Sequence, residues 1–316
     1  MPLKLVPYNT AIDFLGKRWI AFILSIMMII ASFALLASRG LNFGIDFTGG
    51  ILIEARFEQA PSLAQMREQL SSETLNLGDV SLQTIGSQKD IMIRIGQSKK
   101  ESRKQIDIIN QVKASLEATY GSTIDYRKVD YVGPKVGSEL IASGLWSMVF
   151  ALAAIMFYIW IRFEWHYGLG AVLALIHDVI LTLGFLSITQ LDVNLSSVAA
   201  LLTIIGYSIN DSVVIFDRIR ENLRKYKTMD LPELLNRSIN DNLARTLLTS
   251  LTTLVALLAL VIMGGDVILS FSLAAFFGVI VGTYSSIFVA APILIFTKLR
   301  ADTTLGSSDN VATPAP

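Results

Sequence analysis

The sequence contains no cysteine, only two histidines (His166 and His177) and few charged residues. Asp, Glu, Lys and Arg make up 16% of the 316 residues, against about 25% in an average soluble domain. Without cysteine the chain has no disulfides, thiol nucleophile, Fe–S ligands or cysteine-based zinc site. With two histidines a multi-histidine metal site is implausible, so we expect no metal and no other cofactor.

The charges that are present balance, and apolar residues are abundant. There are 26 basic and 26 acidic residues, whereas a nucleic-acid partner would require a basic excess. The hydrophobic share of 53% and the mean hydropathy of +0.56 indicate a membrane protein. No G-x-x-x-x-G-K-[ST] loop occurs, so we predict a protein without an ATP site. We also expect that it is not an enzyme. Energy for transport would come from another subunit or from an ion gradient.

Six long uncharged or nearly uncharged runs predict six spanning helices, arranged one plus five. A spanning helix needs about 20 residues with few or no charges. The runs cover 19–38, 140–161, 165–191, 193–216, 246–265 and 267–297. The sixth has 31 residues, too long for one straight span, so we expect it to tilt, to kink at Pro292 or to begin at the interface.

Lys and Arg are concentrated at one end of these spans. They occur in the segment 1–18, in the connection 217–245 and at the start of the tail 298–316, whereas the opposite short loops carry none. The positive-inside rule then places both termini and the connection in the cytoplasm. The segment 39–139 lies outside, and the Ser/Thr/Pro-rich tail is expected to be disordered.

The segment 39–139 has the length and the pattern of an extracytoplasmic α+β domain. Alternating apolar residues predict strands, and Ser62 with Gln65 can cap a helix. The expected order is strand 50–57, helix 62–75, strands 80–85 and 91–95, helix 101–120 and strand 124–132. This β-α-β-β-α-β order is typical of ferredoxin-like domains. The domain has no catalytic constellation, so we expect it to contact a polypeptide, either by strand addition or by packing against a partner subunit.

Ionisable residues inside the predicted spans are the candidate functional residues, because each costs about 2.5–3.5 kcal/mol on insertion scales. His177 and Asp178 lie near the middle of the third span. Asp211 lies toward the cytoplasmic side of the fourth span. Polar residues on or beside its helix face are Thr203, Tyr207 and Asn210.

Arg245, with Thr249 on its face, begins the fifth span at a depth similar to that of Asp211, so the two could pair. Low dielectric favours a neutral carboxyl group and a nearby Arg favours the ionised one, so alternation between the two would couple protonation to helix movement. Alternatively, Arg245 is only a positive-inside anchor, Asp211 an interfacial residue, and His177 with Asp178 hydrogen-bond neighbouring helices. The residues alone leave Asp178 and Asp211 equal, and leave H⁺ and Na⁺ open.

Small residues recur every four positions along the sixth span, Gly278 and Gly282 among them. Such a face lets another helix approach closely, so we predict a role in packing.

Three stretches together resemble the SecF branch of the SecD/SecF family of bacterial protein-export membrane proteins. They are Phe43–Gly50, with its Gly-Ile-Asp-Phe-Thr-Gly-Gly motif, Val132–Gly137 and Gly206–Asn222. The resemblance covers about residues 10–300 and implies one half of an RND-type transporter, with SecD as the other half. It implies use of the proton motive force in the bacterial inner membrane to help draw an unfolded preprotein across.

The family's two proton-conducting residues fall on Asp211 and Arg245, which favours Asp211 and leaves His177 and Asp178 as secondary candidates. The motif residues Gly44, Asp46, Gly49 and Gly50 are expected to form a turn or hinge. The partners implied are SecD and the SecYEG translocon, with SecA and YajC as associates. Alternatives are an RND-type efflux permease half for lipids or small molecules, for which the external segment is small, and a structural scaffold, in which the intramembrane charges would be dispensable.

Overall fold

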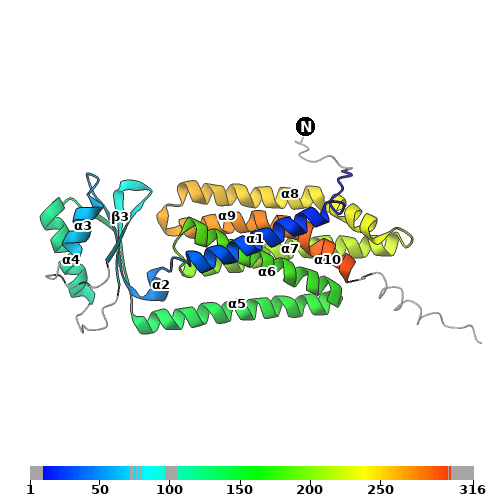
Figure 1. Cartoon of the computed structure of the whole chain (residues 1–316), viewed down its shortest axis with the longest axis horizontal. Coiled ribbons are helices and arrows are strands. Elements are labelled where there is room, and N and C mark those ends of the chain that lie inside the picture. The colour runs from blue at the N-terminus through cyan, green and yellow to red at the C-terminus, as the bar shows by residue number, and fades with distance from the viewer. Residues whose placement is uncertain are drawn as a thin grey trace, which may run out of the picture. The chain divides into compact units, whose positions relative to one another are not determined.

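The computed structural model describes residues 10–71, 75, 77, 80–96, 105–297 and 299. The chain divides into two compact units (Figure 1). The membrane unit comprises the described residues of 1–41, 148–191 and 196–316. The external unit comprises those of 42–147 together with the short segment 192–195. A connection between two spanning helices therefore belongs to the external unit.

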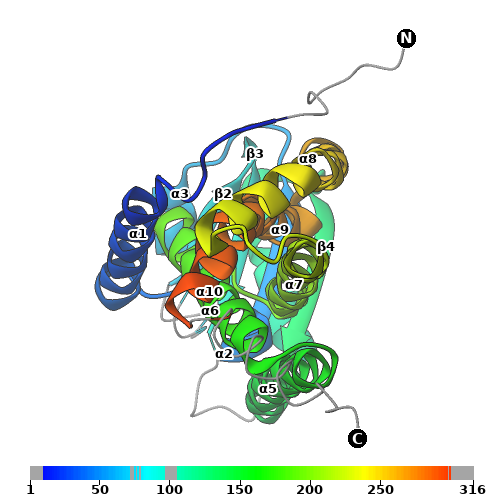
Figure 2. The same ribbon diagram turned by 90° about the vertical axis from the view of Figure 1, so that its right-hand side faces the viewer.

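Six helical segments in the described part of the chain are long and apolar enough to cross a membrane, which confirms the predicted number and the one-plus-five order. They are α1 (Arg18–Ser38), α5 (Pro134–Arg162), α6 (Trp165–Thr189), α7 (Leu195–Lys225), α8 (Leu231–Met263) and a sixth made of α9 (Asp266–Ser285), the π-helical turn η1 (Ser286–Ala290) and α10 (Ala291–Phe296). Within the membrane unit α1 packs on α6, α6 on α9, and α9 on α8 (Figure 2).

The predicted connection 217–245 is helical over most of its length. α7 continues to Lys225, and α8 begins at Leu231. Ile219 and Leu235 are buried in the core of the membrane unit, so an apolar face persists on both helices after the uncharged runs end. The uncharged runs ended α7 too early and began α8 too late, because each run stops at the first charged residues.

The sixth span changes helix type immediately before Pro292. Proline has no backbone N–H, and its ring clashes with the carbonyl four residues earlier, here that of Phe288. The wider π-turn Ser286–Ala290 accommodates this clash, and Pro292 then lies in the first turn of α10. The long run is therefore interrupted by a change of helix type next to Pro292, whereas a kink, a tilt and an interfacial start remain predictions.

The external unit contains a four-stranded antiparallel sheet in the order β2-β3-β1-β4. The strands are β1 (Gly50–Arg56), β2 (Val80–Ile85), β3 (Ser87–Ile95) and β4 (Asp125–Val132), and the helices are α2 (Ile45–Thr48), α3 (Leu63–Leu70) and α4 (Gln105–Tyr120). Both α3 and α4 cover one face of the sheet (Figure 1). Ile53, Ile93, Met66 and Leu116 are fully buried between the two layers. The chain order confirms the predicted β-α-β-β-α-β pattern.

The four-residue helix α2 was not predicted, because it is shorter than the period that a pattern needs. It lies within the glycine-containing motif. Gly49 and Gly50 follow it with φ values of 71° and 122°, a region that residues with a Cβ rarely adopt. A Cβ at Gly50 would also overlap the backbone carbonyl of Ile95. These two glycines therefore let the chain leave α2 and enter β1 directly.

Candidate functional site

Asp178 is the centre of a hydrogen-bond network that joins three helices of the membrane unit. Its side chain, on α6, is 1% exposed. Ser208 of α7 and Ser285 of α9 both donate to its Oδ2, at 2.5 and 2.7 Å. His177 Nδ1 lies 2.9 Å from its Oδ1. Both carboxylate oxygens therefore have partners, which is the condition for burying such a group at low cost.

His177 extends this network toward α1. Its ring stacks on that of Tyr284, with the centroids 6.0 Å apart. The Tyr284 hydroxyl donates to the backbone carbonyl of Ala21 at 2.9 Å. Nδ1 faces the Asp178 carboxyl group, and the buried Nε2 has no hydrogen-bond partner among the described residues.

Asp211 presents the opposite situation. It lies on α7, three residues after Ser208, and is 3% exposed. Its buried Oδ2 has no hydrogen-bond partner in the described part of the chain. Arg245 of α8 lines a cleft whose wall includes Val213 and Val214, two and three residues after Asp211, but no ion pair joins Arg245 to Asp211 among the residues that the structure describes. The predicted pairing of Asp211 with Arg245 is thus a proximity without contact.

Arg245 is exposed and lines a polar cleft of about 400 Å³. Val213 and Val214, which follow Asp211 on α7, form part of the cleft wall. Asn242 of α8 lines it too and donates to the Val214 carbonyl at 3.2 Å. The other lining residues are Tyr158, Arg162, Phe163, Asp217, Arg218 and Glu221. A polar approach therefore reaches α7 within one turn of Asp211.

Of the four residues predicted to support a polar stripe, one reaches another helix. Tyr207 donates to Ser250 of α8 at 3.1 Å, and the Ser250 hydroxyl lies 2.7 Å from that of Thr283 on α9. Thr203 and Thr249 bond to carbonyls of their own helices, and Asn210 is exposed. Tyr207 therefore belongs to a chain of hydroxyl groups across three helices.

Gly278 and Gly282 lie where α9 approaches α7. A Cβ at Gly278 would overlap the side chain of Ile204, and one at Gly282 would lie 3.1 Å from the Cβ of Ser208. This close approach allows Ser208 and Ser285 to reach one carboxylate from two helices. The turn-motif residues Gly44, Asp46, Gly49 and Gly50 belong instead to the external unit.

Sequence analysis missed three hydroxyl groups of these hydrogen-bonded sets. Ser250 and Thr283 belong to the chain that begins at Tyr207, and Ser285 belongs to the network around Asp178. A serine in an apolar span usually bonds to its own helix, so its type alone carries little signal. Ser285 lies three residues after Gly282, and that position on a close-packed face is the clue that could have found it. The described residues contain no cluster of three or more His, Asp or Glu side chains that could hold a metal ion.

Comparisons with known proteins agree on one family. The family model for the protein-export membrane proteins SecD/SecF, C-terminal part, matches residues 111–300. The model for the SecD/SecF GG motif matches residues 34–61. The protein translocase subunits SecF of Rickettsia felis and Rickettsia bellii are both 53% identical to this chain over 294 residues, covering 93% of it and 94–95% of the relatives.

Solved structures give the same result. The crystal structure of SecDF, a translocon-associated membrane protein from Thermus thermophilus, matches 93% of this chain with a TM-score of 0.82 and 31% identity. A crystal structure of SecDF in a super-membrane-facing form matches 97% with a TM-score of 0.68. This chain spans 40% and 41% of those two SecDF chains.

Proposed function

Because the chain belongs to the SecD/SecF family of protein-export membrane proteins, we propose that it is the SecF-type half of a complex that uses the proton motive force to assist protein export. Its partner is SecD, since the SecDF chains that it resembles are more than twice as long as the part that it matches. The complex acts on unfolded preproteins at the SecYEG translocon, with SecA and YajC as associates. It lies in the bacterial inner membrane with both termini in the cytoplasm.

The observation that carries the proposal is the buried carboxyl group of Asp211, whose Oδ2 has no hydrogen-bond partner among the described residues. A buried carboxylate without a partner is costly, and the cost disappears when the group is protonated or paired. Asp178, buried to the same degree, already accepts hydrogen bonds from two helices besides its own. A group that must gain and lose a proton needs two states of similar free energy, and Asp211 meets this condition better than Asp178.

Arg245 stabilises the ionised state of Asp211, which is the second of the two states. When Asp211 loses its proton toward the polar cleft, the carboxylate that remains attracts the guanidinium group of Arg245, which stays charged at any physiological pH. The attraction draws α8 and α7 together near the cleft, and renewed protonation releases them. Each proton that passes Asp211 therefore moves one helix against another, and the proton gradient gives the cycle its direction.

The test replaces Asp211 with Asn and measures preprotein export in membrane vesicles with and without a proton gradient, with SecD present. We expect the gradient-dependent part of export to be lost, because the amide cannot exchange a proton in this way. The matched control is Asp217→Asn, the same change two turns further along α7 on an exposed side chain that lines the cleft. Export that stays gradient-dependent and undiminished in Asp211→Asn would contradict the proposal.

Arg245→Met tests the second state in the same vesicles. The variant keeps a long side chain but cannot attract the carboxylate, so we expect gradient-dependent export to fall. Full activity would identify Arg245 as an anchor at the membrane boundary. Replacing the proton gradient with a sodium gradient in the same experiment distinguishes the two coupling ions.

A further inference from the structure

The chain just before β1 forms a parallel bridge with the connection between α6 and α7. Phe43 pairs with Val193. The Gly44 N–H donates to the Val193 carbonyl at 2.8 Å, and the Val193 N–H donates to the Asn42 carbonyl at 2.8 Å. Two segments about 150 residues apart in the chain are therefore joined by backbone hydrogen bonds within the external unit.

Asp46 caps the first turn of α7 across this bridge. Leu195 is the first residue of α7, so its N–H has no acceptor within that helix. The Asp46 Oδ2 accepts from this N–H at 3.0 Å. A negative charge at a helix N-terminus is further stabilised by the helix dipole. The acidic residue of the glycine motif thus holds the start of the helix that carries Asp211.

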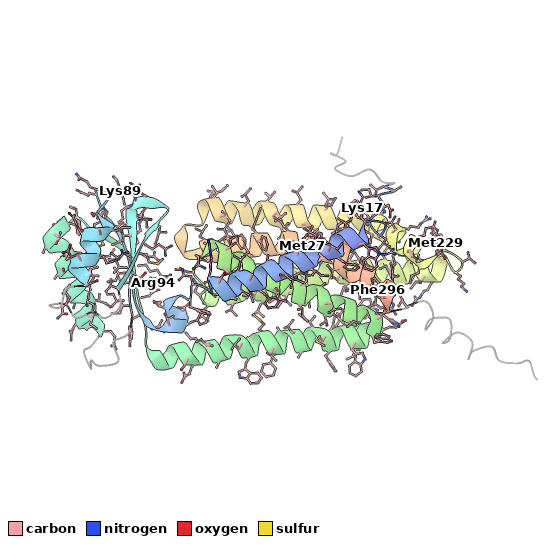
Figure 3. The ribbon with its side chains drawn as sticks, viewed as in Figure 1. Lys17, Met27, Lys89, Arg94, Met229 and Phe296 are labelled. Carbon is pink, nitrogen blue, oxygen red and sulfur yellow. The ribbon has the colours of Figure 1, made fainter. Side chains whose placement is uncertain are left out.

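Arg94, on an inner strand of the sheet, binds the connection between α6 and α7 through Asp192. It lies on β3, opposite Leu52 of β1 (Figure 3 labels Arg94). Its guanidinium group pairs with Asp192 and also donates to the Asn42 Oδ1 at 3.1 Å. The Asn42 amide donates in turn to Asp192 at 2.9 Å. Both charged side chains are mostly buried, with 16% and 21% exposed, so solvent screens this pair less than a surface pair.

We propose that Asp46 and Arg94 are positioning residues that couple α7 to the external sheet. Leu195 belongs to the external unit, and α7 runs from it as one α-helix through Asp211 to Lys225. A displacement or rotation of α7 during proton exchange would therefore move two contacts. The contact of Leu195 with Asp46 transmits the movement to α2 and β1, and the contact of Asp192 with Arg94 transmits it to β3. This inference rests on the proposed function of Asp211.

Two quantities separate coupling from a merely local structural role. One is proton flux through the complex that depends on Asp211, and the other is gradient-driven preprotein export. Residues that couple the two processes affect export alone, because proton exchange at Asp211 does not need the external sheet. Both are measured on proteoliposomes that contain the full chain with SecD, SecYEG and SecA.

In Asp46→Ala, we expect export to fall about fivefold or more while proton flux stays within about twofold of the native value. Asn caps helices about as well as Asp through its side-chain oxygen, so Asp46→Asn should retain most of the export. Equal loss of flux and export in the alanine variant would overturn the inference, and so would unchanged export.

The ion pair is tested by exchanging its charges. Arg94→Asp and Asp192→Arg should each reduce export, and the double variant should recover part of it while flux remains throughout. Lys89→Asp on the same strand is the control, because Lys89 is exposed and has no ion pair among the described residues. If Asp46→Ala does not fold and is not recovered from the membrane, this charge exchange still tests whether the external sheet is coupled to α7. A double variant no better than the single ones contradicts coupling through this pair.

The two hypotheses fail in different ways. If Asp211→Asn leaves flux and export unchanged, the proposed function is wrong. If Asp211→Asn abolishes both while the Asp46 and Arg94 variants export normally, only the coupling inference is wrong.

Discussion

Asp178 and Asp211 are two carboxyl groups in one helical unit, equally buried but differently surrounded. Asp178 is bonded to side chains from its own and two other helices, whereas the Oδ2 of Asp211 has no partner among the described residues. Burial alone therefore does not identify the functional carboxylate of a membrane helix. The difference lies in the number of hydrogen-bond donors that surround each carboxyl group among the described residues.

Helix α7 carries Asp211 and also contributes to the hydrogen-bond network of Asp178. Ser208 ties this helix to Asp178, and Asp211 lies three residues further along it. One part of α7 is thus held against α6 and α9, while the adjoining turn carries the group that changes charge. Three predictions test this comparison through the free energy of unfolding.

The largest effect is expected for Asp178→Ala. The change removes the acceptor of the Ser208 and Ser285 hydroxyls and the partner of His177 Nδ1. Ser285 keeps the Gly282 carbonyl of its own helix as an acceptor, whereas Ser208 and His177 Nδ1 are left buried without another side-chain partner among the described residues. We expect a loss of about 3–5 kcal/mol in unfolding free energy, measured by thermal and denaturant unfolding of the purified protein in detergent. Asp178→Asn keeps an acceptor oxygen and should lose clearly less. An alanine variant of native stability would show that the network does not hold the helices together.

A smaller effect is expected for Ser285→Ala. It removes one of the two hydroxyl donors to the Asp178 Oδ2 and leaves Ser208 in place. The expected loss is about 0.5–1.5 kcal/mol, the usual range for a hydrogen bond between membrane helices. Ser286→Ala is the matched control. Its neighbouring, equally buried hydroxyl donates to the Thr283 carbonyl of its own span and to no other described residue. Equal losses in the two variants would mean that the link between helices adds nothing.

The smallest effect is expected for Asp211→Asn, the variant that should abolish gradient-dependent export. No side-chain hydrogen bond of Asp211 to a described residue is lost, so the unfolding free energy should change by less than about 1 kcal/mol. A loss of unfolding free energy as large as that of Asp178→Ala would contradict this expectation. It would show that the Asp211 side chain stabilises the folded protein as much as the Asp178 side chain does.

The elements of both units were largely predictable because each depends on a local pattern. Uncharged runs marked the six spans, and the alternation in Ile51–Ile53 and Ile91–Ile93 marked strands of the sheet. Gly121 follows the last residue of α4, as a helix-ending residue should. These patterns fail where the element is too short, as in α2, or where an apolar face continues beside charges, as in α7 after Asp217.

The surroundings of the candidate residues were not predictable, because they depend on which helices are neighbours. Ser208 and Ser285 lie 30 and 107 residues from Asp178, and spacing along one helix says nothing about such distances. The sequence predicts a similar depth for Asp211 and Arg245, but a similar depth would not determine whether two side chains touch. Likewise, no local pattern links Asp46 to Leu195, 149 residues later.

The contribution of residues 192–195 to the external unit also bears on how the protein is made. Ribosomes deliver the chain from its N-terminus, and domains generally fold as they emerge. The four strands of the sheet are complete at Val132, but Asp192 and Leu195 follow only after α5 and α6 have been synthesised. Until then Arg94 lacks Asp192, although Asn42 is already present, and Asp46 lacks the N–H of Leu195. The external unit therefore acquires its final contacts only after α5 and α6 have been synthesised, so its last hydrogen bonds form late although its sheet is encoded early.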